Sequence, residues 1–119
     1  RYSVENFLRA KAHYLCAGPL AQRDGVVVWG AGKTGRRIAK HLERGGCAPE
    51  VFVDVTPKKI GSTLRGKPVI SPDDLPVWWR RYTWPILLVA VASRGARVLI
   101  REYLGGLHMV EGEDYLCVA

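Results

Sequence analysis

The sequence predicts an α/β protein with a doubly wound, mainly parallel sheet and an N-terminal helix, and two observations lead to this prediction. The first is the segment 26–35, V-V-V-W-G-A-G-K-T-G, where a short apolar run enters a G-x-G-x-x-G motif and a helical pattern follows. The second is Asp54, an acid that ends another short apolar run nineteen residues after Gly35. Strand, glycine turn, helix, strand and acid in this order are typical of a Rossmann-like, dinucleotide-binding unit.

The N-terminal helix is expected at about 3–17, within a leading segment at 1–20. Ser3 carries a hydroxyl that suits a helix N-cap. Apolar residues recur at helical spacing and fall on one face: Val4, Phe7, Leu8, Ala12 and Leu15. Gly18-Pro19 ends this pattern.

The α/β core is expected at 26–119 and begins with a strand at 26–29 and a helix at 33–44. The sheet-facing stripe of this helix consists of Gly35, Ile38, Ala39 and Leu42, and Gly45-Gly46 stops it. The second strand is predicted at 51–55. Trp29, at the end of the first strand, is expected to point into the core.

The second half of the chain has weaker patterns. Glycines and prolines after residue 55 predict loops around a strand at 67–70 and a helical turn starting at 71–74. The continuous apolar run at 86–92 predicts a buried strand. A helix at 96–104 with Gly105-Gly106 as its stop and a final strand at 115–118 follow.

The tryptophans between these elements leave two interpretations open. Trp78, Trp79 and Trp84 either cover the sheet edge or form an interface patch.

Each glycine of the motif has an expected role. Gly30 lets the chain turn sharply, Gly32 lets backbone approach a pyrophosphate, and Gly35 lets the helix pack closely on the sheet. Asp54 is expected to accept hydrogen bonds from ribose hydroxyls and to repel a 2′-phosphate, which favours NAD over NADP, although Lys58 and Lys59 soften this preference. The candidate site at the carboxyl ends of the strands consists of Gly30, Ala31, Gly32, Lys33, Thr34, Gly35, Asp54, Ser93 and Arg94.

The alternative is that the glycines only shape a tight turn and that nothing binds. The chain has room for one mononucleotide-binding half and a strand or two, which argues against a self-sufficient dehydrogenase. No catalytic residue is predicted, because no G-x-S-x-G, H-E-x-x-H, P-loop or Tyr-x-x-x-Lys pattern occurs. His13 and His41 are expected on helix surfaces and His108 in a loop.

Composition sets further limits. The 119 residues suit one domain, and the first residue, Arg1, is expected to mark a fragment of a longer protein. The net charge of +7 comes from scattered basic residues, so phosphorylated small molecules or an anionic surface are favoured over nucleic acid. No apolar run approaches the roughly 20 residues of a membrane span.

No metal site is predicted either. Cys16, Cys47 and Cys117 lie far apart, have no histidine at ligand spacing and are expected to be free core or surface thiols. Their odd number fits a reducing, cytoplasmic setting. Glu111, Glu113 and Asp114 are expected in a solvated turn rather than around a metal.

Several segments together resemble a C-terminal extension of some bacterial family 2 glycosyltransferases. They are R-Y-S-V-E-N-F-L-R-A-K-A-H-Y-L, W-G-A-G-K-T-G-R-R-I-A-K-H-L, V-F-V-D-V-T-P-K-K-I-G, R-G-K-P-V-I-S-P-D-D-L-P and L-L-V-A-V-A-S-R-G-A-R-V-L-I-R-E-Y-L, which cover nearly the whole chain. The glycine motif, K-I-G and R-G-K-P-V-I-S are more loosely similar to the nucleotide-sugar-binding N-terminal domain of sugar O-acyltransferases.

The resemblance implies an N-terminal glycosyltransferase domain as partner, with a nucleotide-sugar donor and a D-x-D metal motif. This chain contains no D-x-D, so glycosyl transfer is not assigned to its residues. The resemblance carries over the glycine turn and Asp54, and it adds Arg97 as a residue that meets a phosphate at the start of the helix after the 86–92 strand.

Three functional hypotheses follow. The first is an accessory domain of a glycosyltransferase that binds a nucleotide or nucleotide-sugar without catalysis. The second is an NAD-binding fragment of an oxidoreductase, and the third is a structural or interaction module without a ligand. The sequence predicts no oligomeric state.

Overall fold

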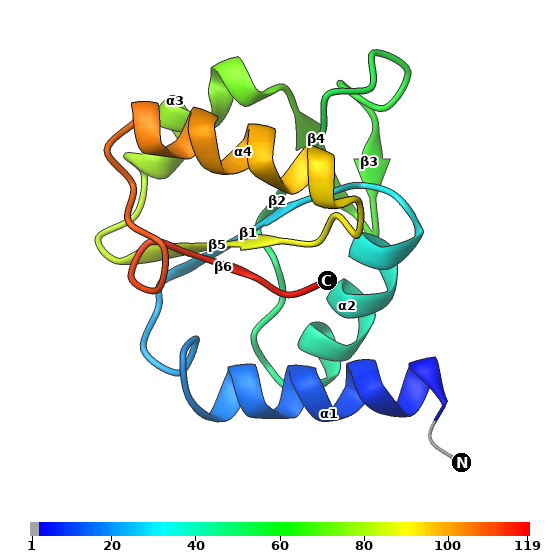
Figure 1. Cartoon of the computed structure of the whole chain (residues 1–119). Helices are drawn as coiled ribbons and strands as arrows, with labels where there is room; N and C mark the ends of the chain where they lie inside the picture. The colour runs from blue at the N-terminus through cyan, green and yellow to red at the C-terminus, as the bar shows by residue number, and fades with distance from the viewer. Residues whose placement is uncertain (1–2) are drawn as a thin grey trace.

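A computed structural model describes residues 3–119 and confirms the predicted Rossmann-like α/β fold (Figure 1). The helices are α1 (Val4–Ala17), α2 (Lys33–Arg44), α3 (Leu75–Trp79) and α4 (Arg94–Gly106), and a 3-10 turn, η1 (Pro72–Asp74), precedes α3. The strands are β1 (Gly25–Trp29), β2 (Val51–Val53), β3 (Thr63–Leu64), β4 (Lys67–Ile70), β5 (Pro85–Val89) and β6 (Tyr115–Cys117). Residues 1 and 2 of the predicted leading segment lie outside the described residues.

Within the described part of the chain, the strands form one sheet in the order β3-β4-β2-β1-β5-β6. All neighbouring pairs are parallel except β3 and β4, which form an antiparallel hairpin. The chain moves outward from β1 to β2 and β4, then returns to the other side of β1 for β5 and β6. This reversal between β1 and β5 leaves a crevice at their carboxyl ends, which is where open α/β sheets bind ligands.

Two cores form because successive residues of β1 point to opposite faces of the sheet. Val26 and Val28 pack with α1 and α2, whereas Val27 and Trp29 pack with α3 and α4. Figure 1 shows the corresponding layers, with α1 and α2 below the sheet and α3 and α4 above it. Trp29 is buried as predicted, and its ring meets Tyr103 of α4 edge-on at 5.7 Å between ring centroids.

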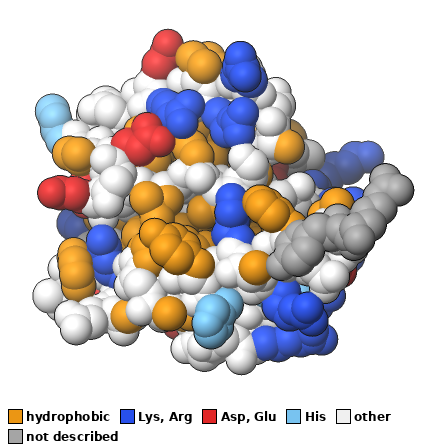
Figure 2. All heavy atoms as spheres, turned by 60° about the horizontal axis from the view of Figure 1, so that its bottom comes forward, with side chains coloured by type: hydrophobic (Ala, Val, Ile, Leu, Met, Phe, Trp, Pro, Cys, Tyr) orange, Lys and Arg blue, Asp and Glu red, His pale blue; other side chains and the backbone are white. Residues whose placement is uncertain are grey.

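Helix α1 has the predicted cap but a narrower buried stripe than predicted. The Ser3 hydroxyl accepts a hydrogen bond from the backbone N–H of Asn6 at 3.1 Å. The buried residues are Leu8, Ala12 and Leu15. Val4 and Phe7 were expected on this face but are exposed, as is Tyr14. On the side of the molecule seen in Figure 2, hydrophobic side chains lie among basic ones. Phe7 turns away because it lies about 100° around the helix axis from Leu8.

His41 is not on a helix surface, so this prediction is wrong. Helix α1 covers it, and its Nε2 lies 2.6 Å from Oε2 of Glu5. The Lys40 amine donates to the same oxygen at 3.1 Å. The hydrogen bonds from Lys40 and then His41 lower the pKa of Glu5. Glu5 therefore ties the start of α1 to the second half of α2.

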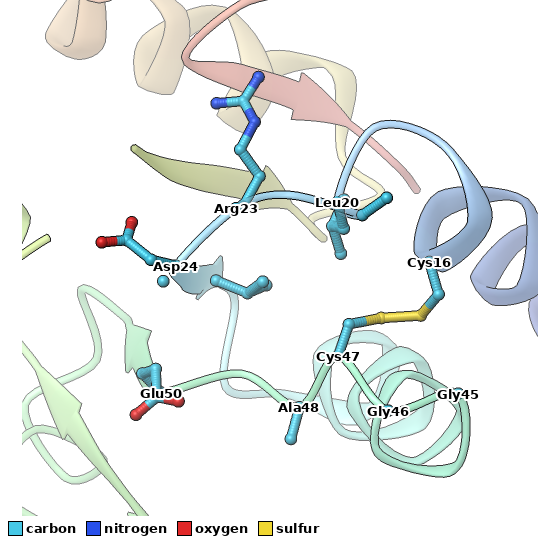
Figure 3. Close-up of a pocket in the computed structure, with 12 residues that line it drawn as sticks. Cys16, Leu20, Arg23, Asp24, Gly45, Gly46, Cys47, Ala48 and Glu50 are labelled. Atoms are coloured by element: carbon cyan, nitrogen blue, oxygen red, sulfur yellow. A yellow bond between two sulfur atoms is a disulfide. The ribbon is translucent and has the colours of Figure 1, made fainter. Parts of the chain in front are cut away.

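The prediction of three free thiols is wrong for two of them. Cys16, near the end of α1, and Cys47, shortly after α2, form a disulfide (Figure 3). Cys117 is free and half-buried. The disulfide is a contact between the ends of two helices, which sequence spacing alone does not indicate. The prediction of a reducing setting rested on the odd number of cysteines, which one disulfide and one free thiol account for equally well.

The second half of the chain differs most from the prediction. The hairpin strand β3 and the short helix α3 were not predicted. Helix α4 begins at Arg94 and continues through Gly105 and Gly106, which were expected to stop it. The helix ends at Gly106 with Leu107 as its C-cap, and the following residue, His108, adopts a left-handed φ of 63°. No helix within residues 3–119 is long and apolar enough to cross a membrane.

The three tryptophans after η1, which were expected either to cover the sheet edge or to form an interface patch, lie in two different environments. Trp78 and Trp79 pack partly against the core on the α3 and α4 side. Trp84 is exposed, and the Arg23 guanidinium stacks over its ring at 4.1 Å from the centroid.

Candidate nucleotide-binding site

The turn between β1 and α2 is closely packed at two of its glycines. Gly30 has a φ of +124°, and a Cβ there would lie 2.8 Å from the carbonyl oxygen of Ala90. A Cβ at Gly35 would overlap the carbonyl oxygen of Gly30. The positive φ of Gly30 confirms the predicted sharp turn, and the overlap at Gly35 confirms the close packing predicted there. A side chain at either position would force α2 or β5 away from the turn.

Gly32 has a different environment. It is the N-cap of α2 with a φ of −89°, which other residues adopt, and no side chain there accepts from the free N–H groups of the helix. A Cβ at Gly32 would meet only the amine of Lys59, at 3.5 Å, an ordinary contact. Packing within the protein therefore does not require glycine at this position, and the positive end of α2 remains without a side-chain cap.

Asp54 follows β2 and holds the glycine turn in place. Its side chain is buried, Oδ2 accepts from the Ala31 N–H at 2.8 Å, and Oδ1 accepts from the Thr56 N–H at 2.9 Å. Burial acts to raise the pKa of Asp54, but the hydrogen bonds from Ala31 and Thr56, together with the charge of Lys59, outweigh it and lower the pKa. Asp54 is therefore ionised at neutral pH, and its carboxylate retains lone pairs for a further donor.

A cavity of about 370 Å³ opens at this edge of the sheet. The carboxyl ends of β1, β2 and β5 and the first turns of α4 form its walls. Gly32, Lys33, Asp54 and Lys59 line its polar part. Its apolar part includes Val55 and Leu99, which are 67% and 66% exposed although they are aliphatic. The cavity thus combines apolar walls with a few convergent polar groups, which is typical of sites for small ligands.

A second hollow, of about 480 Å³, lies on the other side of the same turn. It shares Gly32 and Lys33 with the first cavity and adds Ala31, Arg36 and Leu64. The start of α2 therefore separates two neighbouring hollows, and both have basic side chains at their rims.

The structure brings together only part of the predicted site. Of the predicted residues, five line the first cavity: Gly30, Gly32, Lys33, Thr34 and Asp54. Five do not line it: Ala31, Gly35, Ser93, Arg94 and Arg97. The Ser93 hydroxyl caps α4 by accepting from Ala96 N–H at 3.4 Å. The Arg97 guanidinium donates to the carbonyl oxygen of Ala119 at 2.6 Å. Binding by these residues stays a prediction.

Several residues that line the cavity were not in the predicted site, among them Val55 and Leu99. Lys59 was expected only to soften the preference for NAD over NADP. Lys59 belongs to the K-I-G sequence five residues after Asp54, and its position relative to the glycine turn depends on how the loop folds back. In the sequence, Leu99 does not differ from an ordinary residue of an amphipathic helix. Only their exposure in the structure distinguishes the side chains of Val55 and Leu99 from core residues.

A further cavity, of about 340 Å³, lies beside the disulfide, near the amino ends of the strands (Figure 3). Two of its charged side chains, Arg23 and Asp24, are held by hydrogen bonds within the protein. Arg23 donates to the carbonyl oxygens of Pro85 and Glu113 at 2.9 and 2.8 Å. Asp24 accepts from the N–H groups of residues 83 and 84, and these bonds lower its pKa. This cavity is not the candidate site.

Two of the three acidic residues near the C-terminal end, Glu111 and Asp114, have partners within the protein as well. Glu111 forms an ion pair with Arg101 at 3.1 Å, and Asp114 accepts from the Val110 N–H at 2.7 Å. Within residues 3–119, no group of three or more His, Cys, Asp or Glu side chains is placed to hold a metal ion.

Comparisons with known proteins identify structures with the same fold. No protein-family model matches the sequence, and no curated protein matches it. Solved structures match with high probability. One is the UDP-D-quinovosamine 4-dehydrogenase from Vibrio fischeri, with 28% identity over 80% of this chain and 77% of that chain and a TM-score of 0.63. The fold of this chain is Rossmann-like.

RSP, a Rex-family repressor, has the same fold at lower identity. Its complex with β-NADH is 19% identical over 98% of this chain, with a TM-score of 0.62. Another RSP structure is 16% identical over 88% of this chain, with a TM-score of 0.63. This chain spans about half of RSP, 54% and 49% in the two structures. Nothing in these comparisons supports the resemblance to a glycosyltransferase, which stays a prediction.

Proposed function

We propose that this Rossmann-like domain binds a nucleotide with a pyrophosphate group, with NAD as the first candidate ligand. The observation that carries the proposal is the environment of Gly32. This residue lines the cavity, begins α2 without a side-chain cap and has no packing reason to be glycine. A bound phosphate explains all three features, because it needs close backbone approach and favours free N–H groups at a helix start.

The remaining walls of the cavity suit the other parts of such a ligand. Val55 and Leu99 offer apolar surface for a flat base. Asp54 lies between this surface and the glycine turn, where a ribose hydroxyl would donate to its carboxylate. The β-NADH complex of RSP supports the choice of NAD, since RSP has the same fold.

A nucleotide-sugar is the second candidate ligand. The Vibrio fischeri enzyme that is 28% identical to this chain is a UDP-sugar dehydrogenase by name. In either case the domain binds without catalysing a reaction by itself, because neither the motifs nor the cavity provide a catalytic set. Chemistry would come from other parts of a longer protein, an oxidoreductase or, from the sequence resemblance, a glycosyltransferase.

A thermal-shift panel with NAD, NADH, NADP and several UDP-sugars tests the proposal. A ligand at 100 times its dissociation constant stabilises a protein by about 2.7 kcal/mol, which is easily measured. The decisive variant is Gly32→Asp, because aspartate is a favoured N-cap and keeps the fold while its carboxylate blocks phosphate approach. We expect an unchanged or higher melting temperature and no ligand-induced shift. A wild-type protein that responds to none of these ligands would favour a structural or interaction module.

A further inference from the structure

Lys59 occupies an unusual position for a lysine. Its loop, between β2 and β3, turns back so that the Lys59 amine lies over the start of α2, 3.5 Å from where a Gly32 Cβ would be. The side chain is half-buried and lines the 370 Å³ cavity. Among the ion pairs found for residues 3–119, none involves Lys59.

The charges around this amine are unbalanced. The start of α2 carries the positive end of the helix dipole, so a cation beside it is unfavourable unless an anion lies between them. The nearby carboxylate of Asp54 attracts this amine, whose charge helps to lower the pKa of Asp54, but the two form no ion pair. Two positive features therefore face the same part of the cavity, and a ligand with more than one negative charge would offset both.

Hydrogen bonds fix the backbone of the loop that carries Lys59. The Lys59 N–H donates to the carbonyl oxygen of Thr56 at 2.9 Å, and the Thr56 N–H in turn donates to Asp54. Two residues further, the Gly61 N–H donates to the Val69 carbonyl on β4 at 2.9 Å. These bonds connect the loop to both the glycine turn and the sheet.

We propose that Lys59 contacts the phosphates of the bound ligand and makes the site selective for nucleoside diphosphates over monophosphates and nucleosides. The inference rests on the proposed function and deepens it. The helix N–H groups hold one phosphate, and the Lys59 amine donates to the second as a charge-assisted hydrogen bond. NAD, ADP-ribose and UDP-sugars all contain such a diphosphate, so Lys59 acts on this shared chemistry rather than on the base.

The neighbouring residue provides a matched control. Lys58 has the same charge, is exposed and does not line the cavity. Isothermal titration of wild type, Lys59→Ala and Lys58→Ala with ADP, AMP, NAD and inorganic pyrophosphate measures the effect. We expect Lys59→Ala to weaken ADP, NAD and pyrophosphate about tenfold or more, and AMP by clearly less. Lys58→Ala stays within about twofold for all four, and Lys59→Arg restores most of the diphosphate affinity.

The outcomes separate this inference from the proposed function. If Lys59→Ala binds ADP and NAD as tightly as wild type does, the role of Lys59 is overturned and nucleotide binding is left intact. An equal loss for AMP and ADP would also overturn it, because Lys59 would then act on the nucleoside or on the fold. If pyrophosphate binds and depends on Lys59 but no nucleotide binds, the phosphate-binding role of Lys59 is supported and the proposed function is overturned. Binding of none of the four probes would overturn both.

Discussion

The carboxylate of Asp54 accepts a hydrogen bond from the backbone N–H of Ala31 at 2.8 Å, which joins the end of β2 to the glycine turn after β1. The two strands bring these residues together because β1 and β2 are parallel and Trp29 pairs with Val53. The turn is thus held in shape without a ligand, which lowers the entropic cost of binding.

The first prediction concerns the stability that this bond provides. Asp54→Asn keeps one acceptor oxygen and replaces the other with an amide that cannot accept, so one of two backbone N–H groups loses its partner. We expect the free energy of unfolding to fall by about 1–3 kcal/mol, measured by urea denaturation. Asp54→Ala should cost more, since both N–H groups are left without the carboxylate. Unchanged stability in both variants would show that solvent satisfies these groups equally well.

The second prediction is the pH dependence of the same contribution. The pKa of Asp54 is lowered from 3.8 in the folded protein, so its stabilising effect is fully present above the unfolded-state value of 3.8. It is lost as the pH falls below 3.8 through the folded pKa. The difference in unfolding free energy between wild type and Asp54→Asn should therefore be constant from pH 7 to pH 5 and shrink below pH 4. The subtraction removes the contributions of the other carboxylates. A difference in unfolding free energy that stays constant down to pH 2 would contradict this pH dependence.

The third prediction compares two glycines within helices. A Cβ at Gly35 would overlap the Gly30 carbonyl, so Gly35→Ala should destabilise the domain by at least about 2 kcal/mol. Gly105 of α4 has open space around a Cβ, and alanine is the better helix former, so Gly105→Ala should be neutral or stabilising by up to about 1 kcal/mol. Thermal melts of both variants measure the contrast. Equal effects would mean that α2 moves freely away from the turn.

The fourth prediction concerns the disulfide between Cys16 and Cys47. It closes a loop with a sequence separation of 31, so Cys47→Ser should lower the free energy of unfolding by about 2–4 kcal/mol. Dithiothreitol should destabilise wild type similarly and leave Cys47→Ser unaffected. Cys117→Ser is the control, because this thiol is free. Thiol titration under denaturing, non-reducing conditions should find one free cysteine, and finding three would contradict the disulfide.

The first half of the domain could be predicted well because the local sequence signals there agree with one another. Apolar residues at helical spacing, the Ser3 cap and the Gly45-Gly46 stop predict α1 and α2 at the bounds that the structure has. The turning role of Gly30 and the packing role of Gly35 could be assigned because the strand–turn–helix geometry leaves no room for side chains there.

The rest depends on contacts between segments distant in sequence. The burial of His41 requires that α1 covers it, and the disulfide requires that two helix ends meet. Gly105 and Gly106 suggest a stop, yet the helix continues through them. Lys59 joins the candidate site only because its loop folds back over α2, which no local pattern encodes.

The last prediction is a preference for NAD over NADP. The ionised carboxylate of Asp54 lies where the ribose is expected, and the 2′-phosphate of NADP would add up to two negative charges beside it. Two charges a few ångströms apart at the rim of a protein cavity repel by more than about 1.4 kcal/mol, so NADP should bind at least about tenfold more weakly. Asp54→Asn removes the charge and should narrow the ratio of the two dissociation constants, even if it weakens both ligands. Titration of wild type and Asp54→Asn with both dinucleotides at the same ionic strength measures this ratio. Equal or tighter binding of NADP by wild type would mean that Lys58 and Lys59, rather than Asp54, determine the charge that the 2′-position meets.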